Sequence, residues 1–242
     1  MICVDITLPS PEENLALDEA LLSACEEAAR EGGPAGGEVL RFWESGTPFV
    51  VLGVSGKMLH EVDLEACERC GIPVLRRASG GGTVLQGPGC LNFSLILSLA
   101  IRPELADLRK GISCILERTA RGLGLEALCF RGTSDLALGD RKVSGNAQKR
   151  TRHALLHHGT LLHGMDPGDV GRFLPPPPKE PAYRAGRTHE EFLGNLPLDA
   201  ERMKARLRTA WEATPAGPEW HPPRVQELIT EKYGNPAWTA RF

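Results

Sequence analysis

Residues 76–84 read Arg-Arg-Ala-Ser-Gly-Gly-Gly-Thr-Val. The two arginines end a stretch at 72–77 that we predict to be a strand. Glycines lack Cβ atoms, so three in succession can adopt positive φ and approach a ligand closely. The turned N–H groups of such a loop attract phosphate or carboxylate oxygens, and Arg76 and Arg77 add charge-assisted donors. The run matches neither the Walker loop nor the GxGxxG pattern. It is therefore an anion-binding loop of another kind, or a flexible glycine loop with surface arginines.

The sequence around this run alternates between helical and strand patterns without a regular βαβ repeat. Apolar residues at helical spacing, often ended by glycine, predict helices at 12–32, 61–70, 103–124, 199–213 and 222–233. Short apolar and β-branched stretches predict strands at 38–43, 49–53, 72–77, 91–99, 134–145 and 154–163. The proline run at 175–178 is typical of an extended surface crossing. This mixture predicts an α+β fold with a mixed or antiparallel sheet flanked by helices.

Length and charge limit the classes of protein that the chain can represent. With 242 residues it can bury one sizeable core, or one core and a small appendage. A net charge of −3 leaves no general attraction for nucleic acid. No apolar run approaches the length of a membrane span, and the first residues do not form a secretory signal. We therefore expect a soluble, cytoplasmic protein without nucleic-acid or membrane partners.

The seven cysteines do not form the paired framework of a secreted protein, because their number is odd and their spacing irregular. Cys67 and Cys70 make a CxxC motif, which can hold a metal or a disulfide. No second CxxC or matching histidine pair accompanies it, and residues 61–70 look like one amphipathic helix. We interpret the motif as helical spacing, and we expect no metal site made by protein side chains alone.

Two later segments add side chains that suit acyl transfer. Residues 140–148, Asp-Arg-Lys-Val-Ser-Gly-Asn-Ala-Gln, place Lys142 near a glycine turn. A lysine there can stabilise charge that develops on an acyl carbonyl or a bridging phosphate oxygen. Residues 155–162 read as a strand with His157 and His158 in its middle. A solvated lysine and ordinary hydrogen-bonding histidines are the alternatives.

Together these segments resemble the lipoate–protein ligase family, within the group that also contains biotin ligases and octanoyltransferases. RRASGGGTV at 76–84 resembles the arginine–glycine motif of the family, GDRKVSGNAQ at 139–148 its lysine motif, and HHGTLL at 157–162 the strand that follows. Upstream, NLALDEALL at 14–22, LRFWESGTPFVVLG at 40–53 and EVDLEACERCGIPVLRR at 61–77 are also similar. The glycine–arginine pattern of biotin ligases differs from residues 76–84.

The resemblance implies a catalytic domain related to biotin ligases and class II aminoacyl-tRNA synthetases. Ligases of the family use ATP and Mg²⁺ to convert lipoate or octanoate into an acyl-adenylate. They then transfer the acyl group to a lysine of a lipoyl domain or a glycine-cleavage H-like carrier protein. By motif position, Lys142 would hold the carbonyl and phosphate oxygens as the catalytic residue. The residues that would bind the acyl-adenylate are Arg76, Arg77, Ser79, Gly80, Gly81, Gly82, Asp135, Ser144, Gly145, His158, Gly159 and Thr160.

The sequence departs from the family pattern in two places. Many family ligases follow the glycine run with tyrosine, histidine and aspartate, whereas residues 85–89 here read Leu-Gln-Gly-Pro-Gly. The family's small C-terminal accessory domain is too large for what remains after residue 215. We therefore predict a catalytic domain at 1–215 and a docked extension at 216–242. A separate accessory subunit is a further partner that the resemblance leaves open.

Alternatives remain for the reaction and for several roles. An octanoyltransferase of this fold would use a cysteine thioester with octanoyl carrier protein, and Cys129 is the candidate nucleophile. A non-catalytic subunit that binds lipoyl carriers is the second alternative. His157, His158 and Asp135 are candidates for the base that deprotonates the carrier lysine. The residues that we consider for the acyl-chain wall, with core packing as the alternative, are Trp43, Phe49, Val51 and Phe93.

Overall fold

The main sheet of the protein has eight strands in the order β11-β1-β2-β6-β10-β9-β8-β7. The structure is a computed structural model, and it describes residues 1–31, 37–215 and 222–242. β1 pairs in parallel with β2 and β11, and the remaining neighbours are antiparallel, so the sheet is mixed as predicted. The strands are β1 (Ile2–Asp5), β2 (Val39–Trp43), β6 (Cys90–Ser98), β7 (Leu128–Arg131), β8 (Asp135–Leu138), β9 (Arg141–Arg150), β10 (Ala154–Leu162) and β11 (Thr214–Pro215).

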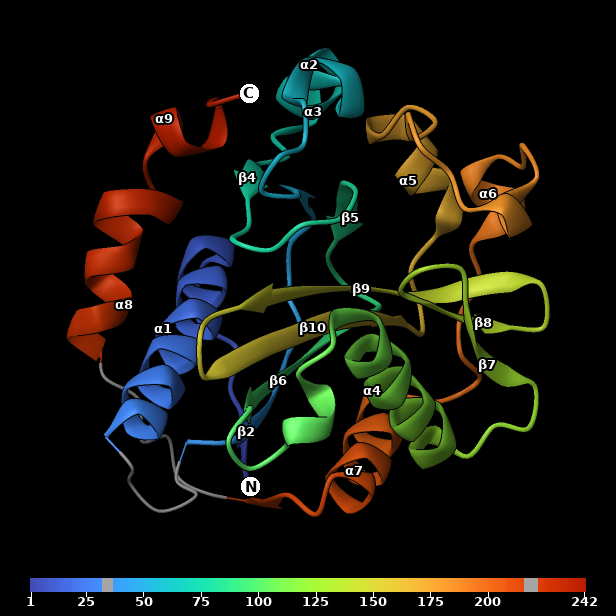
Figure 1. Cartoon of the computed structure of the whole chain (residues 1–242). Helices are drawn as coiled ribbons and strands as arrows, with labels where there is room; N and C mark the ends of the chain where they lie inside the picture. Colours follow the sequence, from blue (N-terminus) through green and yellow to red (C-terminus); the bar gives the residue numbers. More distant parts are fainter. Residues whose placement is uncertain (32–36, 216–221) are drawn as a thin grey trace.

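A second sheet of three strands lies above β9 and β10 in Figure 1. Its order is β4-β3-β5, with β4 parallel and β5 antiparallel to the central strand. The strands are β3 (Phe49–Leu52), β4 (Val74–Arg76) and β5 (Val84–Gln86). The glycine run at 80–82 connects β4 to β5, so this small sheet holds the run over the face of the main sheet.

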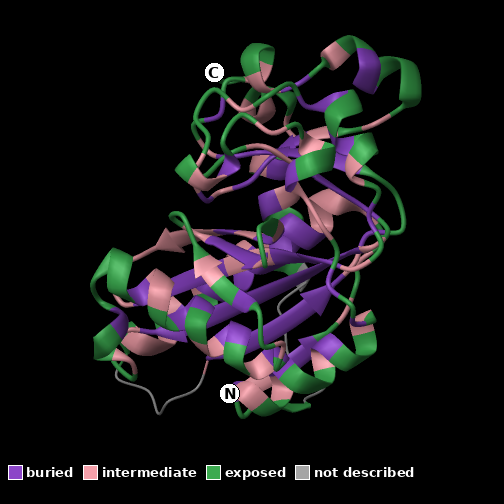
Figure 2. Ribbon diagram, turned by 90° about the vertical axis from the view of Figure 1, so that its right-hand side faces the viewer, coloured by how far each residue is buried: buried purple, intermediate pink, exposed green. Residues whose placement is uncertain are grey.

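Helices cover both faces of the main sheet. On one face, α4 (Leu108–Leu123) and α7 (Ala200–Ala210) pack against each other and share a core with alternate residues of β6, such as Phe93. On the other face, α1 (Pro11–Arg30) and α8 (Pro222–Leu228) share a core with Ile96 of the same strand. β6 is buried along its whole length because both of its faces are covered (Figure 2).

A third core joins the small sheet to short helices at the top of Figure 1. The helices there are α2 (Met58–Glu61), α3 (Leu64–Cys70), α5 (Pro167–Phe173) and α6 (His189–Phe192). The single helix predicted at 61–70 is wrong in detail. The chain is extended at Val62, and Asp63 then caps the new helix by accepting a hydrogen bond from the Ala66 amide.

The other predicted elements are confirmed within a few residues or divided by local turns. Helix 12–32 is α1, which begins with a capping box formed by Ser10 and Glu13 and ends at Arg30, before the undescribed residues 32–36. The segment 103–124 begins with a 3₁₀ turn at 103–105 before α4. The predicted strand 134–145 is a hairpin, because Gly139 adopts a φ of 63° between β8 and β9. β1, β5, β7 and β11 were not predicted.

The CxxC motif lies on one helix, as predicted. Cys67 and Cys70 both lie on α3, the first buried and the second exposed, and all seven cysteines are free thiols. The proline run at 175–178 lies outside any helix or strand. Across residues 1–31, 37–215 and 222–242, no helix is long and apolar enough to cross a membrane.

Candidate active site

A cavity of about 440 Å³ lies between the two sheets and the segment that follows β10. β9 and β10 contribute polar side chains and glycines to it, whereas the glycine run covers it from the small sheet. The segment after β10 closes one end with apolar side chains, which include Met165, Leu174 and Phe192. The cavity therefore combines a polar middle with an apolar wall, as expected of a site for a ligand with both kinds of group.

Arg77 holds the glycine run in its folded shape. Its Nη2 donates to the carbonyl oxygens of Gly80 and Gly82 at 2.6 and 2.9 Å, and its Nε donates to the Ser79 hydroxyl at 3.0 Å. Gly81 adopts a φ of 88°, which an L side chain would strongly disfavour. Burial lowers the pKa of Arg77 to about 10, so the guanidinium stays charged at neutral pH. The backbone of the run is thus fixed before any ligand binds.

A buried chain of polar groups links the glycine run to α1. The Ser79 hydroxyl accepts from Arg77 and is hydrogen-bonded to His158 Nε2 at 2.5 Å. His158 Nδ1 lies 3.6 Å from Asp18, which forms a buried ion pair with Arg41 at 2.6 Å. Because the Ser79 oxygen already accepts from Arg77, its own proton is free to point at Nε2. The remaining proton of a neutral His158 then sits on Nδ1, facing Asp18.

Asp18 is ionised in this chain despite its burial. Burial alone would raise its pKa, but the positive charge of Arg41, the neighbouring His158 and a hydrogen bond from Ser94 outweigh it and hold the pKa below its ordinary value. The Ser94 hydroxyl donates to Asp18 at 2.7 Å. The negative charge of Asp18 therefore orients His158 at the cavity wall.

Lys142 is the principal cation on the β9 side of the cavity. Its Nζ lies 2.8 Å from Asp135, and its side chain is 24% exposed. The Tyr183 hydroxyl donates to the other oxygen of Asp135 at 2.9 Å. Burial, followed by the negative charge of Asp135, raises the pKa of Tyr183, so this hydroxyl keeps its proton. Asp135 thus joins the lysine of β9 to the segment that follows α5.

Local irregularities of β9 and β10 place their polar groups. The neighbours Leu136 and Ala137 of β8 pair with Ser144 and Lys142, so β9 has one extra residue, a bulge, between Lys142 and Ser144. On β10, a Cβ at Gly159 would lie 1.8 Å from Asn146 Oδ1. The Asn146 side chain therefore occupies space that only a glycine at 159 leaves free, and its Nδ2 donates to Ser144 Oγ of the same strand at 3.0 Å.

Comparison with known proteins assigns the family. Residues 10–197 match the lipoyl protein ligase A/B catalytic domain. The chain belongs to this family. A candidate lipoate-protein ligase A of Aeropyrum pernix is 32% identical over 204 residues, which cover 84% of this chain and 72% of the relative. The octanoyltransferase LipM of Symbiobacterium thermophilum is 30% identical, with 96% and 95% covered. Ligases and transferases of the family are thus both close in sequence.

Solved structures of the family share the fold. A lipoate-protein ligase A crystallised with ATP superposes with a TM-score of 0.76 at 22% identity, covering 99% of both chains. A bi-partite lipoate protein ligase of Thermoplasma acidophilum, studied with its E2 lipoyl domain, gives a TM-score of 0.75 at 21% identity and covers 99% of this chain and 95% of that one.

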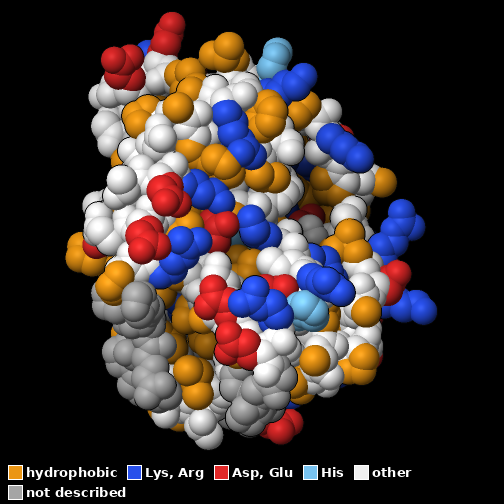
Figure 3. Space-filling view, turned by 60° about the vertical axis from the view of Figure 1, so that its left-hand side comes forward, with side chains coloured by type: hydrophobic (Ala, Val, Ile, Leu, Met, Phe, Trp, Pro, Cys, Tyr) orange, Lys and Arg blue, Asp and Glu red, His pale blue; other side chains and the backbone are white. Residues whose placement is uncertain are grey.

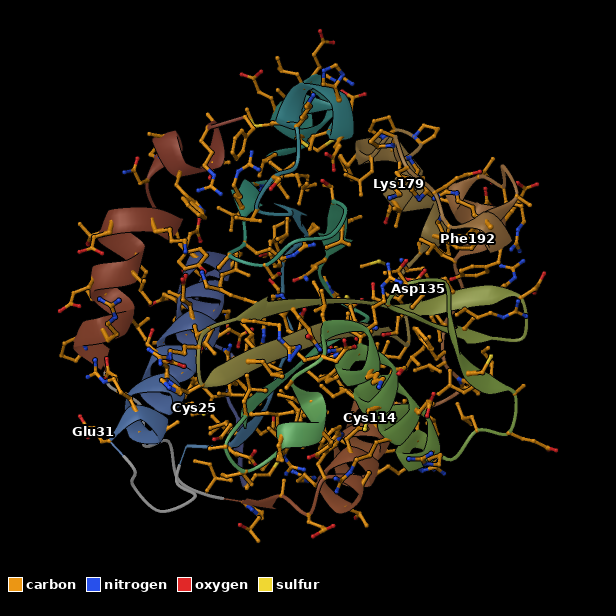
Figure 4. All side chains as sticks on the ribbon, viewed as in Figure 1. Cys25, Glu31, Cys114, Asp135, Lys179 and Phe192 are labelled. Carbon is orange, nitrogen blue, oxygen red and sulfur yellow. The ribbon has the colours of Figure 1, made fainter. Side chains whose placement is uncertain are left out.

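Most of the residues that the family motifs indicate lie together at the cavity. Asp135 and Lys142 face it from β8 and β9, and Figure 4 shows Asp135 near Lys179 and Phe192. Ser79 and Gly80 do not line it, but both accept hydrogen bonds from Arg77, and Ser79 is also hydrogen-bonded to His158. The indicated residues that line the cavity are Arg77, Gly81, Gly82, Asp135, Lys142, Ser144, Gly145, His158, Gly159 and Thr160.

Arg76 has a different position from its neighbour. It does not line the cavity, and its side chain is fully buried on the other side of β4. Its guanidinium donates to the carbonyl oxygens of Gly53 and Gly56 at 2.9 and 2.7 Å, and to that of Thr239 at 2.7 Å. All of these partners are main-chain groups, so in this structure Arg76 serves the fold and has no contact with the site.

The residues considered for the alternative roles also differ in whether they line the cavity. Cys129 is exposed on the edge strand β7 and does not line the cavity. Its partner Ala137 is in turn the partner of Lys142, so two strand spacings, about 10 Å, separate the two. His157 is fully buried and faces Phe93 at 6.1 Å, away from the cavity. Of the four residues considered for the acyl wall, Trp43 lines the cavity, and Phe49, Val51 and Phe93 do not.

Several residues of the site carried no motif that we used. Asp18 and Asn146 lie inside segments that resemble the family, but we assigned them no role. Lys179 and Tyr183 come from the segment after the proline run, which we read only as a surface crossing. Leu85 and Gln86, which stand where many ligases have other residues, line the cavity. Only the fold brings Tyr183 to Asp135, because 48 positions separate them in the sequence.

The described residues contain no group of three His, Cys, Asp or Glu side chains that could hold a metal ion. The donors at the cavity are Lys142, Lys179, Arg184 and the amides of the glycine run, which suit the oxygens of a phosphate or carboxylate. A divalent cation could arrive there only with ligand oxygens that complete its coordination.

Proposed function

We propose that the protein is an ATP-dependent lipoate–protein ligase. It activates lipoate or octanoate with ATP and Mg²⁺, and it transfers the acyl group to a lysine of a lipoyl domain or an H-like carrier protein. The observation that carries the proposal is the position of Lys142 at a cavity closed by the glycine run, with an apolar wall at one end. An acyl-adenylate suits this arrangement, because its apolar chain is followed by a polar part that consists of a carbonyl, a phosphate and a nucleoside.

The chemistry gives Lys142 a defined role in both half-reactions. In activation, a carboxylate oxygen attacks the α-phosphate of ATP, a P–O bond forms, and pyrophosphate leaves. In transfer, the ε-amine of the carrier lysine attacks the acyl carbonyl, a C–N bond forms, and AMP leaves with the bonding electrons. Both steps concentrate negative charge on oxygens, and the Lys142 ammonium can exchange its hydrogen bond with Asp135 for one with those oxygens.

His158 and Asp135 are our candidates for removing a proton from the carrier lysine. Both line the cavity, and each is oriented by a second group, His158 by Asp18 and Asp135 by Tyr183. His157 is a weaker candidate, because it is fully buried and does not reach the cavity. Burial also lowers its pKa to about 3, so it is a poor proton acceptor at neutral pH.

The arrangement of cysteines favours ligation over thioester transfer. None of the seven cysteines lines the cavity, and all of them lie in the described part of the chain. Cys129, the candidate nucleophile for octanoyl transfer, is about two strand spacings from Lys142. A thioester on Cys129 would place its carbonyl outside the cavity, far from the groups that would stabilise the oxyanion.

We further propose that residues 1–215 form the catalytic domain and that residues 216–242 are an extension of it. The Thermoplasma acidophilum ligase that shares this fold is bi-partite, which is a precedent for a ligase made of two parts. A separate accessory subunit is therefore a partner to test beside the carrier domain, and the isolated chain serves as the reference.

The test measures the intact mass of an apo lipoyl domain after incubation with the protein in two parallel reactions. One contains lipoate, ATP and Mg²⁺, and the other contains octanoyl carrier protein without ATP. A lipoyl mass gain only in the first reaction is the expected result. A gain only in the second would replace ligation by thioester transfer. No gain in either reaction would contradict a self-sufficient ligase and favour the non-catalytic alternative, unless a second chain restores turnover.

A further inference from the structure

The last part of the chain lies beside the small sheet that carries the glycine run. α8 is followed by a π-helical turn (Ile229–Tyr233) and α9 (Pro236–Thr239), which pack against α1 and β4. Figure 1 shows α9 and the C-terminus beside β4 and α2, above α1. On this side of the molecule, basic side chains and hydrophobic side chains are interspersed over the upper half (Figure 3).

Arg76 and α9 hold each other through main-chain groups. Nε and Nη2 of Arg76 donate to the Thr239 carbonyl oxygen at 3.0 and 2.7 Å. In the opposite direction, Trp238 Nε1 donates to the Arg76 carbonyl oxygen at 2.8 Å. The Phe242 ring covers the guanidinium at 5.5 Å. Two donors of a buried cation are thus satisfied by the C-terminal segment, and loss of that segment would leave Nε and Nη2 without this partner.

The same arginine also fixes the loop at 53–56, which supports the glycine run. Nη1 of Arg76 donates to the carbonyl oxygens of Gly53 and Gly56, and Arg241 Nη2 donates to that of Val54 at 2.8 Å. The Val54 amide donates to the Ser79 carbonyl oxygen at 2.8 Å. Gly53 packs so closely that an added Cβ would lie 2.0 Å from the carbonyl oxygen of Gly81. A shift of the loop would therefore move the glycine run.

A second contact reaches the start of the run from the π-helical turn. Tyr233 is buried, its hydroxyl donates to Glu19 Oε2 at 2.6 Å, and the amide of Ala78 lies beside this hydroxyl, where it partly offsets the rise that burial causes in the pKa of Tyr233. Ala78 immediately precedes Ser79. The C-terminal segment thus contacts β4 and the beginning of the run at two separate places.

We propose that residues 229–242 are a positioning clamp for the glycine run, and that Arg76 is a positioning residue which connects the two. Arg76 and Arg77 are neighbours in the sequence but then have different roles. Arg77 donates hydrogen bonds to the run from the cavity side. Arg76, on the other side of β4, connects the run to the C-terminal segment. The consequence for catalysis rests on the proposed ligase function, because a loosened run would weaken binding of the nucleotide phosphates.

Hydrogen–deuterium exchange of the peptide that covers residues 76–84 tests the clamp without any assay of activity. Trp238→Phe keeps an aromatic ring for Arg241 and Lys232 but removes the donor to the Arg76 carbonyl. The matched control is Trp211→Phe on the opposite face of the sheet, where Nε1 has no hydrogen-bond partner among the described residues. We expect about five-fold faster exchange in Trp238→Phe and unchanged exchange of this peptide in the control.

The outcomes separate the clamp from a general loss of stability. Unchanged exchange in Trp238→Phe, or equal acceleration throughout the molecule in both variants, would overturn the proposal. Arg76→Lys is the second variant, because lysine keeps the charge but cannot span Thr239, Gly53 and Gly56 together. It should accelerate exchange of the peptide more than Trp238→Phe does.

Kinetics then connect the clamp to the reaction. For Trp238→Phe we expect KM for ATP to rise about five-fold while kcat for acyl transfer changes less than two-fold. A change in exchange without any ligase activity in the wild-type protein would leave the clamp intact and refute the proposed function. An altered kcat with an unchanged KM and unchanged exchange would refute the clamp alone.

Discussion

The two arginines where β4 ends and the lysine of β9 are basic residues that each precede a glycine by a few positions, but their surroundings in the structure differ. Arg76 and Arg77 are buried, and almost every partner of their guanidinium groups is a main-chain carbonyl oxygen. Lys142 remains partly exposed, and its Nζ has a carboxylate of Asp135 as its ion-pair partner. A cation held by the backbone cannot leave without disturbing the fold, whereas a cation held by a side chain can exchange that partner for a ligand.

This difference indicates which basic residues of a motif take part in the reaction and which support the fold. The arginines set the shape of the site before a ligand arrives, and the lysine is left to respond to it. The two regions should therefore fail in different ways when mutated: one through stability and one through turnover. The predictions below test this division in order of decreasing effect.

The largest effect is expected for Lys142→Ala. Removal of the ammonium leaves the developing oxyanion without its principal donor, so acyl transfer should fall by about 10³-fold. The thermal midpoint of unfolding should change little, since Lys142 is partly exposed and has a single ion-pair partner. Intact-mass kinetics with a lipoyl domain measure the first quantity, and thermal unfolding measures the second. Near-normal turnover by the folded variant would show that the site is assigned wrongly.

Arg77→Met should act mainly on stability. The change removes a buried cation and leaves the carbonyl oxygens of Gly80 and Gly82 without their donor. We expect the free energy of unfolding to fall by about 3 kcal/mol. Lys142→Met is the matched control, for which the loss should stay below about 1 kcal/mol. Equal losses in urea-unfolding experiments would erase the distinction between the two regions.

The adjacent histidines of β10 show the same contrast, because His157 is fully buried and His158 lines the cavity. The burial of His157 predicts that the stability of the protein depends on pH. Burial lowers the pKa of His157 to about 3, whereas the unfolded chain titrates near 6.5. Below pH 6.5 the unfolded state binds the additional proton, so stability is lost as the pH falls from there toward 3. We expect His157 to account for about 2 kcal/mol of the loss between pH 7 and pH 5. Unfolding of His157→Phe at both pH values should lack this component, and an identical slope would exclude it.

Tyr183→Phe should have a smaller effect, on turnover. The variant loses the hydrogen bond that fixes Asp135, and through it Lys142. One hydrogen bond contributes about 1 kcal/mol, so kcat/KM should fall about five-fold. Addition of Lys142→Ala should abolish the further effect of Tyr183→Phe, because the tyrosine acts through the lysine. Additive losses in this double-mutant cycle would mean that Tyr183 contributes independently.

The smallest effect is expected for Cys129→Ser. The thiol is exposed on β7 and does not line the cavity, so ATP-dependent transfer should change by less than two-fold. Cys114→Ser, on the exposed side of α4, serves as the reference for an uninvolved thiol. A complete loss specific to Cys129→Ser would move the chemistry to the edge of the sheet.

The sequence was sufficient for the fold class, and several of the candidate site residues that it indicated line one cavity. Periodicity located α1, α4 and α7, and glycine spacing marked Lys142 and the loop at 80–82 as candidates. β3 and β4 are short but lie in clearly apolar stretches, whereas β1 and β11 escaped because they are too short to show an alternating pattern.

The remaining parts of the site depend on tertiary contacts. Neighbouring residues of a strand point to opposite faces, so the dipeptide at 76–77 could not reveal which arginine faces the cavity. Tyr183 follows a proline run and has no motif of its own, yet the fold brings it 2.9 Å from Asp135. Likewise, the contact between Arg76 and Thr239 spans 163 positions. Such pairings are set by packing, and local composition does not contain them.

The pairing of β1 with β11 has a consequence for synthesis on the ribosome. Ile2 lies opposite Thr214, and the Met1 carbonyl oxygen accepts a hydrogen bond from the Thr214 amide. During synthesis the outer edge of β1 therefore stays uncovered until Thr214 has emerged. Unpaired strand edges promote association between chains. We expect nascent chains that stall before residue 214 to be the aggregation-prone species during expression, and slower elongation to lengthen their exposure.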